Sequence, residues 1–292
     1  MPDRSKQPTL ALTIDVEGFA ESHAESVRVP ADLLETGRSD TEIAANLDAT
    51  LALLERFGCR ATFFFLGRIG RTAPHLVRRV ADAGHEIGCH SLWHLRLAAF
   101  SPGELRAALR EARSLLEDAS GTRVVGFRAP EFSIREANRW AFDTLVETGF
   151  RYDSSVVPTG LHDVYGMNGI PQAIFRWPNG LIEFPLPVVR LFGLDIPVGG
   201  GGYFRLYPVS WTLRTLRRRS RQGRPTAFYV HPYEIGPSAP RLPGLPPWRR
   251  LRHYIRLGDG GRRLTVLLRS LKFAPMADVL AAAGFPVDED GA

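Results

Sequence analysis

Ionisable side chains that could carry chemistry recur along the chain, each just after a short apolar segment. The first are Asp15 and Glu17, and the next are His90 and His94, four positions apart. Two neutral imidazoles and one carboxylate make a three-ligand site that leaves coordination positions open for water and substrate. We therefore expect Glu17, His90 and His94 to bind a divalent metal ion.

Asp15 is expected to work beside that metal site. Side chains at positions i and i+2 of a strand point to one face, so Asp15 should lie beside Glu17. A metal-activated water needs a base to accept its proton, and Asp15 is the nearest carboxylate that is not a ligand. We expect Arg128 to hold Asp15 ionised and oriented. His231 is the expected general acid for the departing amine.

Each of these features also has an ordinary structural explanation. An acidic pair after a strand is more often a turn than a site, and two histidines four positions apart are commonly surface or core residues. Asp153 could tune His231 or Arg128, or it could cap a turn, and the role of Glu234 is equally open. The functional hypothesis depends on the coincidence of five polar groups at the ends of successive strands.

The segments that position these residues predict an alternation of strands and helices. Short apolar runs predict buried strands, and the segments between them have apolar residues at helical spacing. This alternation predicts an α/β fold with a parallel sheet, in the form of a distorted (β/α) barrel of about seven units. Catalytic residues of such barrels lie at the carboxyl ends of the strands. The main strands are expected at residues 9–16, 61–66, 86–90, 124–128, 150–154 and 226–231, with shorter ones at 182–184 and 188–191.

We expect a single domain over residues 1–292, in which about residues 236–292 form a C-terminal extension packed on the barrel. A hydrophobic content of 44% with 23% charged residues is typical of a soluble globular protein. The amino-terminal segment lacks the apolar stretch of a signal peptide, which predicts a cytoplasmic protein. The two cysteines, Cys59 and Cys89, cannot form a disulfide framework.

The net charge of +6 could favour an anionic substrate, a lipid phosphate or the periphery of a membrane. A solvated basic face is the simpler explanation. Basic residues cluster at 214–219 and 249–252, but neither cluster is interleaved with the aromatic residues of a nucleic-acid platform. We therefore expect no nucleic-acid partner, and the oligomeric state is not predicted.

Several segments resemble the polysaccharide deacetylases of carbohydrate esterase family 4. The segment from Thr13 to Glu17 looks like the first family motif, whose first acid is the base and whose second is a metal ligand. The segment from His90 to His94 fits the His-Ser/Thr-x-x-His metal motif, which is the most specific of the set. Arg128-Ala129-Pro130 is similar to the third motif, and the segment from Tyr229 to His231 to the last.

Two later segments, 200–205 and 252–254, look like signatures of the subgroup associated with exosortase A exopolysaccharide clusters. The resemblance implies a NodB homology domain that acts as a metal-dependent hydrolase. The implied reaction removes an N-acetyl group from an amino sugar in a poly- or oligosaccharide or a glycolipid precursor. The implied metal is Zn²⁺, although the ligand types also admit Co²⁺, Mn²⁺ or Ni²⁺. We assign substrate binding to Trp177, Tyr233 and Pro130.

The chain departs from the family pattern in two places. Val16 separates the two acids of the first motif, and Glu17 stands where an aspartate is common. The fourth motif's tryptophan is not evident after Asp153, and Trp177 could line the site in its place. Three alternatives remain open: a lipid-linked sugar deformylase, a cyclic imide or amide hydrolase on the same fold, and a catalytically silent carbohydrate-binding barrel.

Overall fold

The structure, a computed structural model, describes residues 8–160 and 164–287. Residues 1–7, on which the localisation prediction rests, lie outside the described residues, as do residues 288–292 of the expected C-terminal extension and the side chain of Arg252. Within the two described ranges, no helix has both the length and the apolar character that crossing a lipid bilayer requires.

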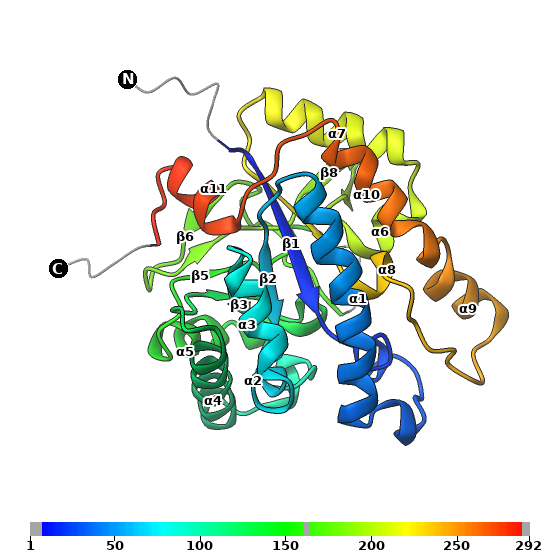
Figure 1. The fold of residues 1–292 in the computed structure, drawn as a ribbon. Helices are drawn as coiled ribbons and strands as arrows, with labels where there is room; N and C mark the ends of the chain where they lie inside the picture. Colours follow the sequence, from blue (N-terminus) through cyan, green and yellow to red (C-terminus); the bar gives the residue numbers. More distant parts are fainter. Residues whose placement is uncertain (1–7, 161–163, 288–292) are drawn as a thin grey trace.

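An eight-stranded sheet forms the centre of the molecule and curls into a half-barrel (Figure 1). Neighbouring strands run parallel, except that the edge strand β6 is antiparallel to β7. In spatial order the strands are β10 (Thr226–Val230), β1 (Leu10–Val16), β2 (Thr62–Phe65), β3 (Glu86–Cys89), β4 (Gly126–Phe127), β5 (Tyr152–Asp153), β7 (Ile182–Glu183) and β6 (Phe175–Arg176). The predicted α/β fold class, a distorted (β/α) barrel, is confirmed.

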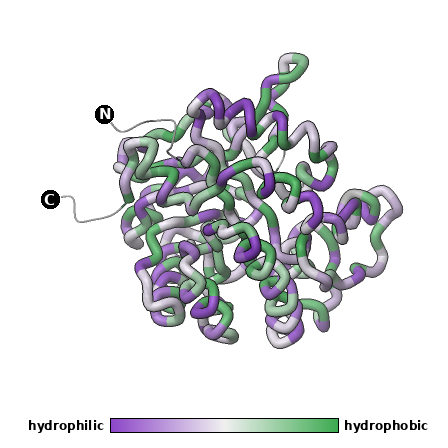
Figure 2. Tube along the Cα trace, turned by 45° about the horizontal axis from the view of Figure 1, so that its top comes forward, coloured by the Kyte–Doolittle hydropathy of each residue, from purple (hydrophilic) through white to green (hydrophobic). Residues whose placement is uncertain are grey.

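Most of the helices lie around the outside of the sheet (Figure 1). Figure 2 shows hydrophilic and hydrophobic segments alternating along these outer helices, as amphipathic helices that bury one face require. The helices are α1 (Thr36–Arg56), α2 (Gly67–Thr72), α3 (Pro74–Asp82), α4 (Pro102–Ser120), α5 (Ala141–Glu147), α6 (Gly201–Leu206), α7 (Val209–Arg221), α8 (Pro232–Ile235), α9 (Pro247–Tyr254), α10 (Gly260–Leu268) and α11 (Met276–Ala282).

The two faces of the sheet contribute to different apolar clusters. Phe63 and Phe65 of β2 pack in the large cluster between the sheet and the helices. Phe64 points the other way, into a second cluster inside the half-barrel, where α11 contributes Met276. Asp15 is the register partner of Phe64, and alternate residues of a strand share a face. Asp15 therefore belongs to the inner face of the half-barrel.

Some elements differ from the sequence-based expectation. The strands expected at 124–128 and 150–154 pair only at 126–127 and 152–153. Residues just beyond these pairs still make backbone hydrogen bonds, such as Arg128 N to Cys89 O and Ser154 N to Phe127 O, and their side chains make the contacts described below. A strand that was not predicted, β9 (Leu194–Pro197), pairs with β8 (Val188–Leu191) in a separate hairpin. Helices α2, α6 and α9 were also not predicted, since segments of six to eight residues carry little periodic signal.

Candidate active site

The predicted site residues come together at the carboxyl end of the sheet. Asp15 is the penultimate residue of β1, His90 follows β3, and Arg128 follows β4. His231 follows β10, which pairs directly with β1. Because neighbouring parallel strands end at the same edge, these side chains converge there, as expected for a (β/α) barrel.

Glu17, His90 and His94 form a compact group in which the three candidate ligand atoms lie within 4.8 Å of one another. The Nε2 atoms of His90 and His94 lie 3.1 Å and 2.9 Å from Glu17 Oε2. His90 Nδ1 lies 2.7 Å from the carbonyl oxygen of Arg128, which can only accept a hydrogen bond. The proton of the neutral ring therefore sits on Nδ1, and the Nε2 lone pair is available to a metal ion. This donor set fits a divalent cation.

The local backbone explains how His90 and His94 meet. Ser91 has a φ of 69°, which is uncommon for a residue with a side chain. The turn is held by two backbone bonds to the start of α2: Gly67 N donates to Ser91 O (2.8 Å), and Arg68 N donates to Leu92 O (3.0 Å). The chain thus reverses just after β3, and both imidazoles reach Glu17.

The charges in this group stabilise one another. Burial alone would raise the pKa of Glu17, but the nearby His94 and the hydrogen bonds from both histidines hold the pKa well below its ordinary value. Burial alone would lower the pKa of His94, yet the Glu17 carboxylate raises it to about 9. Glu17 is therefore a carboxylate at neutral pH, as a metal ligand must be.

Arg128 forms a buried ion pair with Asp15. The Arg128 side chain is completely buried, and its Nη1 donates to Asp15 Oδ1 and to Thr13 Oγ1, both at 2.7 Å. Its other nitrogens donate to the Ser154 carbonyl oxygen (3.1 Å) and hydroxyl oxygen (3.0 Å). The guanidinium also lies 4.4 Å from the centre of the Phe64 ring. These contacts fix the planar guanidinium of Arg128, and the guanidinium in turn fixes the orientation of the Asp15 carboxylate.

His231 is held by a carboxylate that comes from its own turn. Its Nδ1 lies 3.1 Å from Glu234 Oε2, and its Nε2 lies 3.5 Å from Glu17 Oε1. The buried Arg205 donates from Nε to Glu234 Oε1 at 2.7 Å. The ring of Tyr233 stacks on the imidazole at 4.7 Å with an interplanar angle of 9°. His231 is thus fixed in position on two sides.

The pKa values in this second group follow from its contacts. Burial would lower the pKa of His231, but the charge and the hydrogen bond of Glu234 outweigh burial and raise it. Burial would raise the pKa of Glu234, while His231 and Arg205 together lower it to about 2. The imidazole therefore favours its protonated form, which suits a general acid.

Asp153 contacts other residues than His231. Ser155 Oγ donates to Asp153 Oδ1 (2.5 Å) and accepts a hydrogen bond from Ala129 N (2.8 Å). Burial raises the pKa of Asp153 to about 6, and burial beside Asp153 raises the pKa of Glu183 well above its ordinary value. Of the two roles considered for Asp153, these contacts favour the turn that supports Ala129, next to Arg128.

The three residues assigned to substrate binding are all buried. Tyr233 is 4% exposed and packs on His231, and Pro130 lies in the turn after β4. Trp177 is 6% exposed, stacks on Phe142 at 4.3 Å, and donates from Nε1 to Glu183 Oε2 at 3.3 Å. These core contacts occupy the indole and favour a structural role for Trp177 over contact with the substrate.

Sequence reasoning missed the buried ion pairs that support the site. Arg68 binds Glu21 through Nε (2.6 Å) and Nη2 (2.5 Å), and it binds Asp40 through Nη1 (2.6 Å). Glu21 also accepts from Gly18 N at 3.1 Å, so the pair holds the turn that follows Glu17. The only signal in the sequence was a charged residue shortly after an apolar strand. Its partners are 47 and 28 positions away, and spacing cannot identify them.

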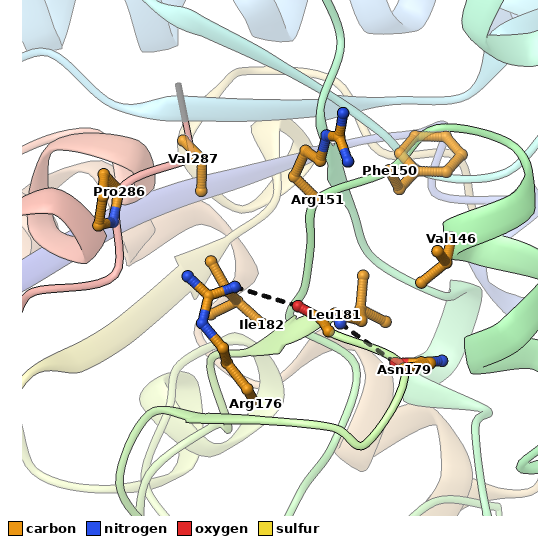
Figure 3. Close-up of a pocket in the computed structure, with 10 residues that line it drawn as sticks. Val146, Phe150, Arg151, Arg176, Asn179, Leu181, Ile182, Pro286 and Val287 are labelled. Atoms are coloured by element: carbon orange, nitrogen blue, oxygen red, sulfur yellow. Dashed lines mark hydrogen bonds between the residues drawn. The ribbon is translucent and has the colours of Figure 1, made fainter. Parts of the chain in front are cut away.

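A separate cavity lies at the other end of the sheet. It has a volume of about 290 Å³, and Arg151 and Arg176 are among the residues that line it (Figure 3). Arg151 precedes β5, and Leu181 precedes β7. The cavity therefore lies at the amino ends of these strands, away from the carboxyl ends where Asp15 and His90 are found.

Comparison with known proteins gives two family-model matches. Residues 37–152 match the model described as "Polysaccharide deacetylase", and residues 154–281 match one described as "Domain of unknown function (DUF3473)". The boundary between the two matches does not divide the fold, because strands from both regions pair in one sheet.

Solved structures share the fold over nearly the whole chain. A protein from Mycobacterium smegmatis described as a polysaccharide deacetylase is 22% identical, with a TM-score of 0.58, over 98% of this chain and 92% of that one. An allantoinase, Puue, is 14% identical, with a TM-score of 0.60, over 97% of this chain and 91% of that one. At these identities the comparison establishes the fold.

Curated relatives match over part of their length. The peptidoglycan deacetylase of Helicobacter pylori is 27% identical over 192 residues, which cover 64% of this chain and 60% of that protein. A peptidoglycan deacetylase-like protein of Gibberella zeae is 30% identical over 139 residues, which cover 47% of this chain and 40% of that protein. The chain thus matches less than two thirds of the length of either relative. The family model and these relatives together support the polysaccharide deacetylase family for this chain.

Proposed function

We propose that this protein is a metal-dependent hydrolase that removes an acetyl group from an N-acetylated amino sugar. The observation that carries the proposal is the grouping of three separately supported functions at one edge of the sheet. These are a buried Glu-His-His ligand set, a carboxylate held by a buried arginine, and an imidazole held by a second carboxylate. The deacetylase names of the curated relatives support the acyl group.

Glu17, His90 and His94 would hold the metal ion, which is Zn²⁺ by resemblance, with Co²⁺, Mn²⁺ and Ni²⁺ also compatible with the ligand types. When bound, such a cation supplies Lewis acidity to an acyl oxygen and to water. His90 is prepared for this role by its bond to the Arg128 carbonyl, which keeps the ring proton away from the metal side.

Asp15 and His231 would move the two protons of the reaction. Asp15 accepts a proton from the attacking water as its oxygen bonds to the acyl carbon. His231 donates a proton to the sugar nitrogen as the C–N bond breaks, so that a free amine and acetate leave. The Asp15 proton then passes to solvent, and His231 is reprotonated. The hydrogen bond from Arg128 keeps Asp15 oriented until the water arrives.

The subgroup, the biological role and the location of the protein are further proposals, and each has its own support. The exosortase-associated subgroup and a role in exopolysaccharide synthesis rest on the motif resemblance, and the cytoplasmic location rests on residues outside the described ranges. The sugar and the length of the glycan are open. A deformylase remains a rival, because a probable deformylase of Shewanella sediminis is 28% identical over 95 residues.

The test is release of acid from N-acetylated and N-formylated amino sugars, from monomers to oligomers, by metal-loaded protein. Acetate released by the wild type and not by the Asp15→Asn variant would support the deacetylase. Formate released in its place would select the rival acyl group. Absence of either acid, with one metal ion bound per chain and sugar binding retained, would contradict the proposed hydrolase and favour a carbohydrate-binding barrel.

A further inference from the structure

The β8–β9 hairpin carries exposed apolar side chains at its tip. Phe192 is 94% exposed, and its neighbours Leu191 and Leu194 are 46% and 48% exposed. Isolated exposed leucines are common in folded proteins, but a fully exposed phenylalanine flanked by two of them is a concentrated apolar surface. Nothing in the described part of the chain covers this tip.

The backbone at the tip is unfavourable for phenylalanine. Phe192 has a φ of 48° and Gly193 a φ of 80°, so both central residues of the two-residue turn are left-handed. Such turns favour asparagine followed by glycine, and the left-handed conformation is unfavourable for a residue with a bulky side chain. Phe192 thus weakens the turn and makes no compensating contact with the core. Contact with a partner outside the chain would explain why a phenylalanine stands at this position.

A second apolar surface lies on α9. Trp248 is 61% exposed and Leu251 is 66% exposed, and residues three apart share one face of a helix. The guanidinium of Arg249 lies 5.0 Å from the Trp248 ring centre, and the neighbouring Arg250 is exposed. Figure 1 shows α9 projecting from the edge of the molecule. The helix therefore presents a tryptophan and a leucine among arginines.

Both surfaces belong to connections that follow parallel strands of the half-barrel. The hairpin follows β7 and α9 follows β10, so both leave the carboxyl ends of parallel strands, where the site lies. The hairpin is anchored there by Thr159 Oγ1, which donates to Asp195 O at 2.7 Å. The C-terminal turn of α9 is anchored by Arg205, which donates to His253 O at 2.5 Å and also binds Glu234 beside His231.

Positive charge accompanies the apolar groups on the α9 side. Arg28 and Arg249 line a groove of about 590 Å³ together with Val27, Leu245 and the prolines near them. On the hairpin, Arg190 pairs with Asp195 at 2.7 Å, so the hairpin itself is close to neutral. The chain as a whole carries a net charge of +6.

We propose that the hairpin tip and α9 together dock the protein on an anionic lipid bilayer, with the site facing the membrane. A bilayer accepts several separate projecting side chains at once, whereas a folded protein partner needs one contiguous complementary surface. Tryptophan is enriched at membrane interfaces, and arginines beside it reach lipid phosphates. The docking would leave the protein peripheral, because apolar contact is confined to a few side chains.

The test is sedimentation of the full-length chain with vesicles of phosphatidylcholine, with and without phosphatidylglycerol, at low and high salt. Wild type is expected to bind the anionic vesicles, and binding should weaken with salt because arginines contribute. Phe192→Asn creates the favoured Asn-Gly turn, so it should fold at least as well as wild type and still bind about 10-fold more weakly. Trp248→Ala should weaken binding by a similar factor, and the double variant by more.

Val266→Ala on α10 is the matched control, because Val266 is an apolar residue that is 36% exposed and belongs to neither surface. This variant should bind like wild type. Absence of wild-type binding to anionic vesicles, or equal binding by the Phe192→Asn/Trp248→Ala variant, would overturn the proposal. Concentration-dependent dimerisation that the double variant abolishes would also overturn it, by assigning the surface to a second copy of the chain. None of these results depends on the hydrolase activity.

Discussion

Asp15, near the end of β1, and Glu17, just after it, lie two residues apart, yet their carboxylates have different surroundings. Asp15 faces one permanently charged group, Arg128, at 2.7 Å. Glu17 faces three imidazoles, of which His94 is the nearest at 2.9 Å. An arginine cannot give up its donor role to a metal ion, whereas a neutral imidazole can. The neighbours therefore decide which carboxylate handles protons and which binds metal.

The supports behind the two carboxylates differ as well. Arg128 is fixed by Ser154 and Thr13, which are parts of the inner face of the sheet. Glu17 begins the long connection to α1, and this connection is held by the pair of Arg68 with Glu21. A rigid sheet therefore positions the proposed base, and a clamped loop positions the proposed ligand.

The largest expected effect comes from Asp15→Asn. The amide keeps the shape of the carboxylate and loses its basicity, so turnover should fall about 10³-fold, in the range that a general base contributes. Bound metal should be unchanged. The measurement is kcat with metal content on the same samples. Turnover near the wild-type value would remove Asp15 from the mechanism.

Glu17→Gln should weaken metal binding, with a loss of activity of about 100-fold at limiting metal. Excess metal should restore part of that activity, because His90 and His94 remain. The same excess should do nothing for Asp15→Asn. Activity titrated against metal concentration measures the difference. An Asp15→Asn variant that recovered in the same way would erase the distinction between the two carboxylates.

Glu234→Gln tests the support of the proposed acid. Removing the carboxylate leaves His231 stacked on Tyr233 but without its charged partner at 3.1 Å. We expect a fall in kcat of about 10–100-fold, the range for groups that orient a functional histidine, with KM and metal content little changed. Asp153→Asn is the comparison variant, and a larger loss of kcat there would favour Asp153 as the partner of His231.

Glu42→Gln should have the smallest effect, and it depends on pH. Glu42 accepts a hydrogen bond from Phe19 N at 2.8 Å, and burial raises its pKa to about 7. Because the pKa is higher in the folded state, the stability from this group is present below its unfolded pKa of about 4.3 and is lost as the pH rises through about 7.

The neutral glutamine should therefore make the protein more stable above about pH 8, on the order of 1 kcal/mol or less, since partial exposure screens the shift. Below about pH 4, where the carboxyl is protonated in both states, the two proteins should have the same stability. Urea midpoints at both pH values measure this. A glutamine variant that is less stable at high pH would show that the ionised carboxylate supports the loop after Glu17.

The strands and the residues at their ends could be predicted from the sequence because both leave local patterns. Apolar runs predicted β1, β2 and β3, and the polar residues of interest lie within a few positions of the end of each run. The roles left open for Asp153 and Glu234 depended on tertiary placement, which spacing along the chain does not give. The contact of Trp177 with Phe142 also depends on tertiary placement. It leaves no local signal in the sequence, so sequence reasoning could assign Trp177 to the substrate.

The Arg68–Glu21 and Arg205–Glu234 pairs could not be predicted, because their members lie 47 and 29 positions apart. Single-sequence spacing predicts contacts only within one element or between elements of known register. The hairpin tip was missed because Phe-Gly is not a preferred sequence for a two-residue turn.

The most direct test of the division between the two carboxylates is the metal content of Asp15→Asn and Glu17→Gln, purified in parallel and dialysed against the same limiting metal concentration. We expect one bound metal ion per chain in Asp15→Asn, as in the wild type. In Glu17→Gln we expect a large loss of bound metal. Loss of metal from Asp15→Asn, or full retention by Glu17→Gln, would contradict the assignment of Glu17 as ligand and Asp15 as base.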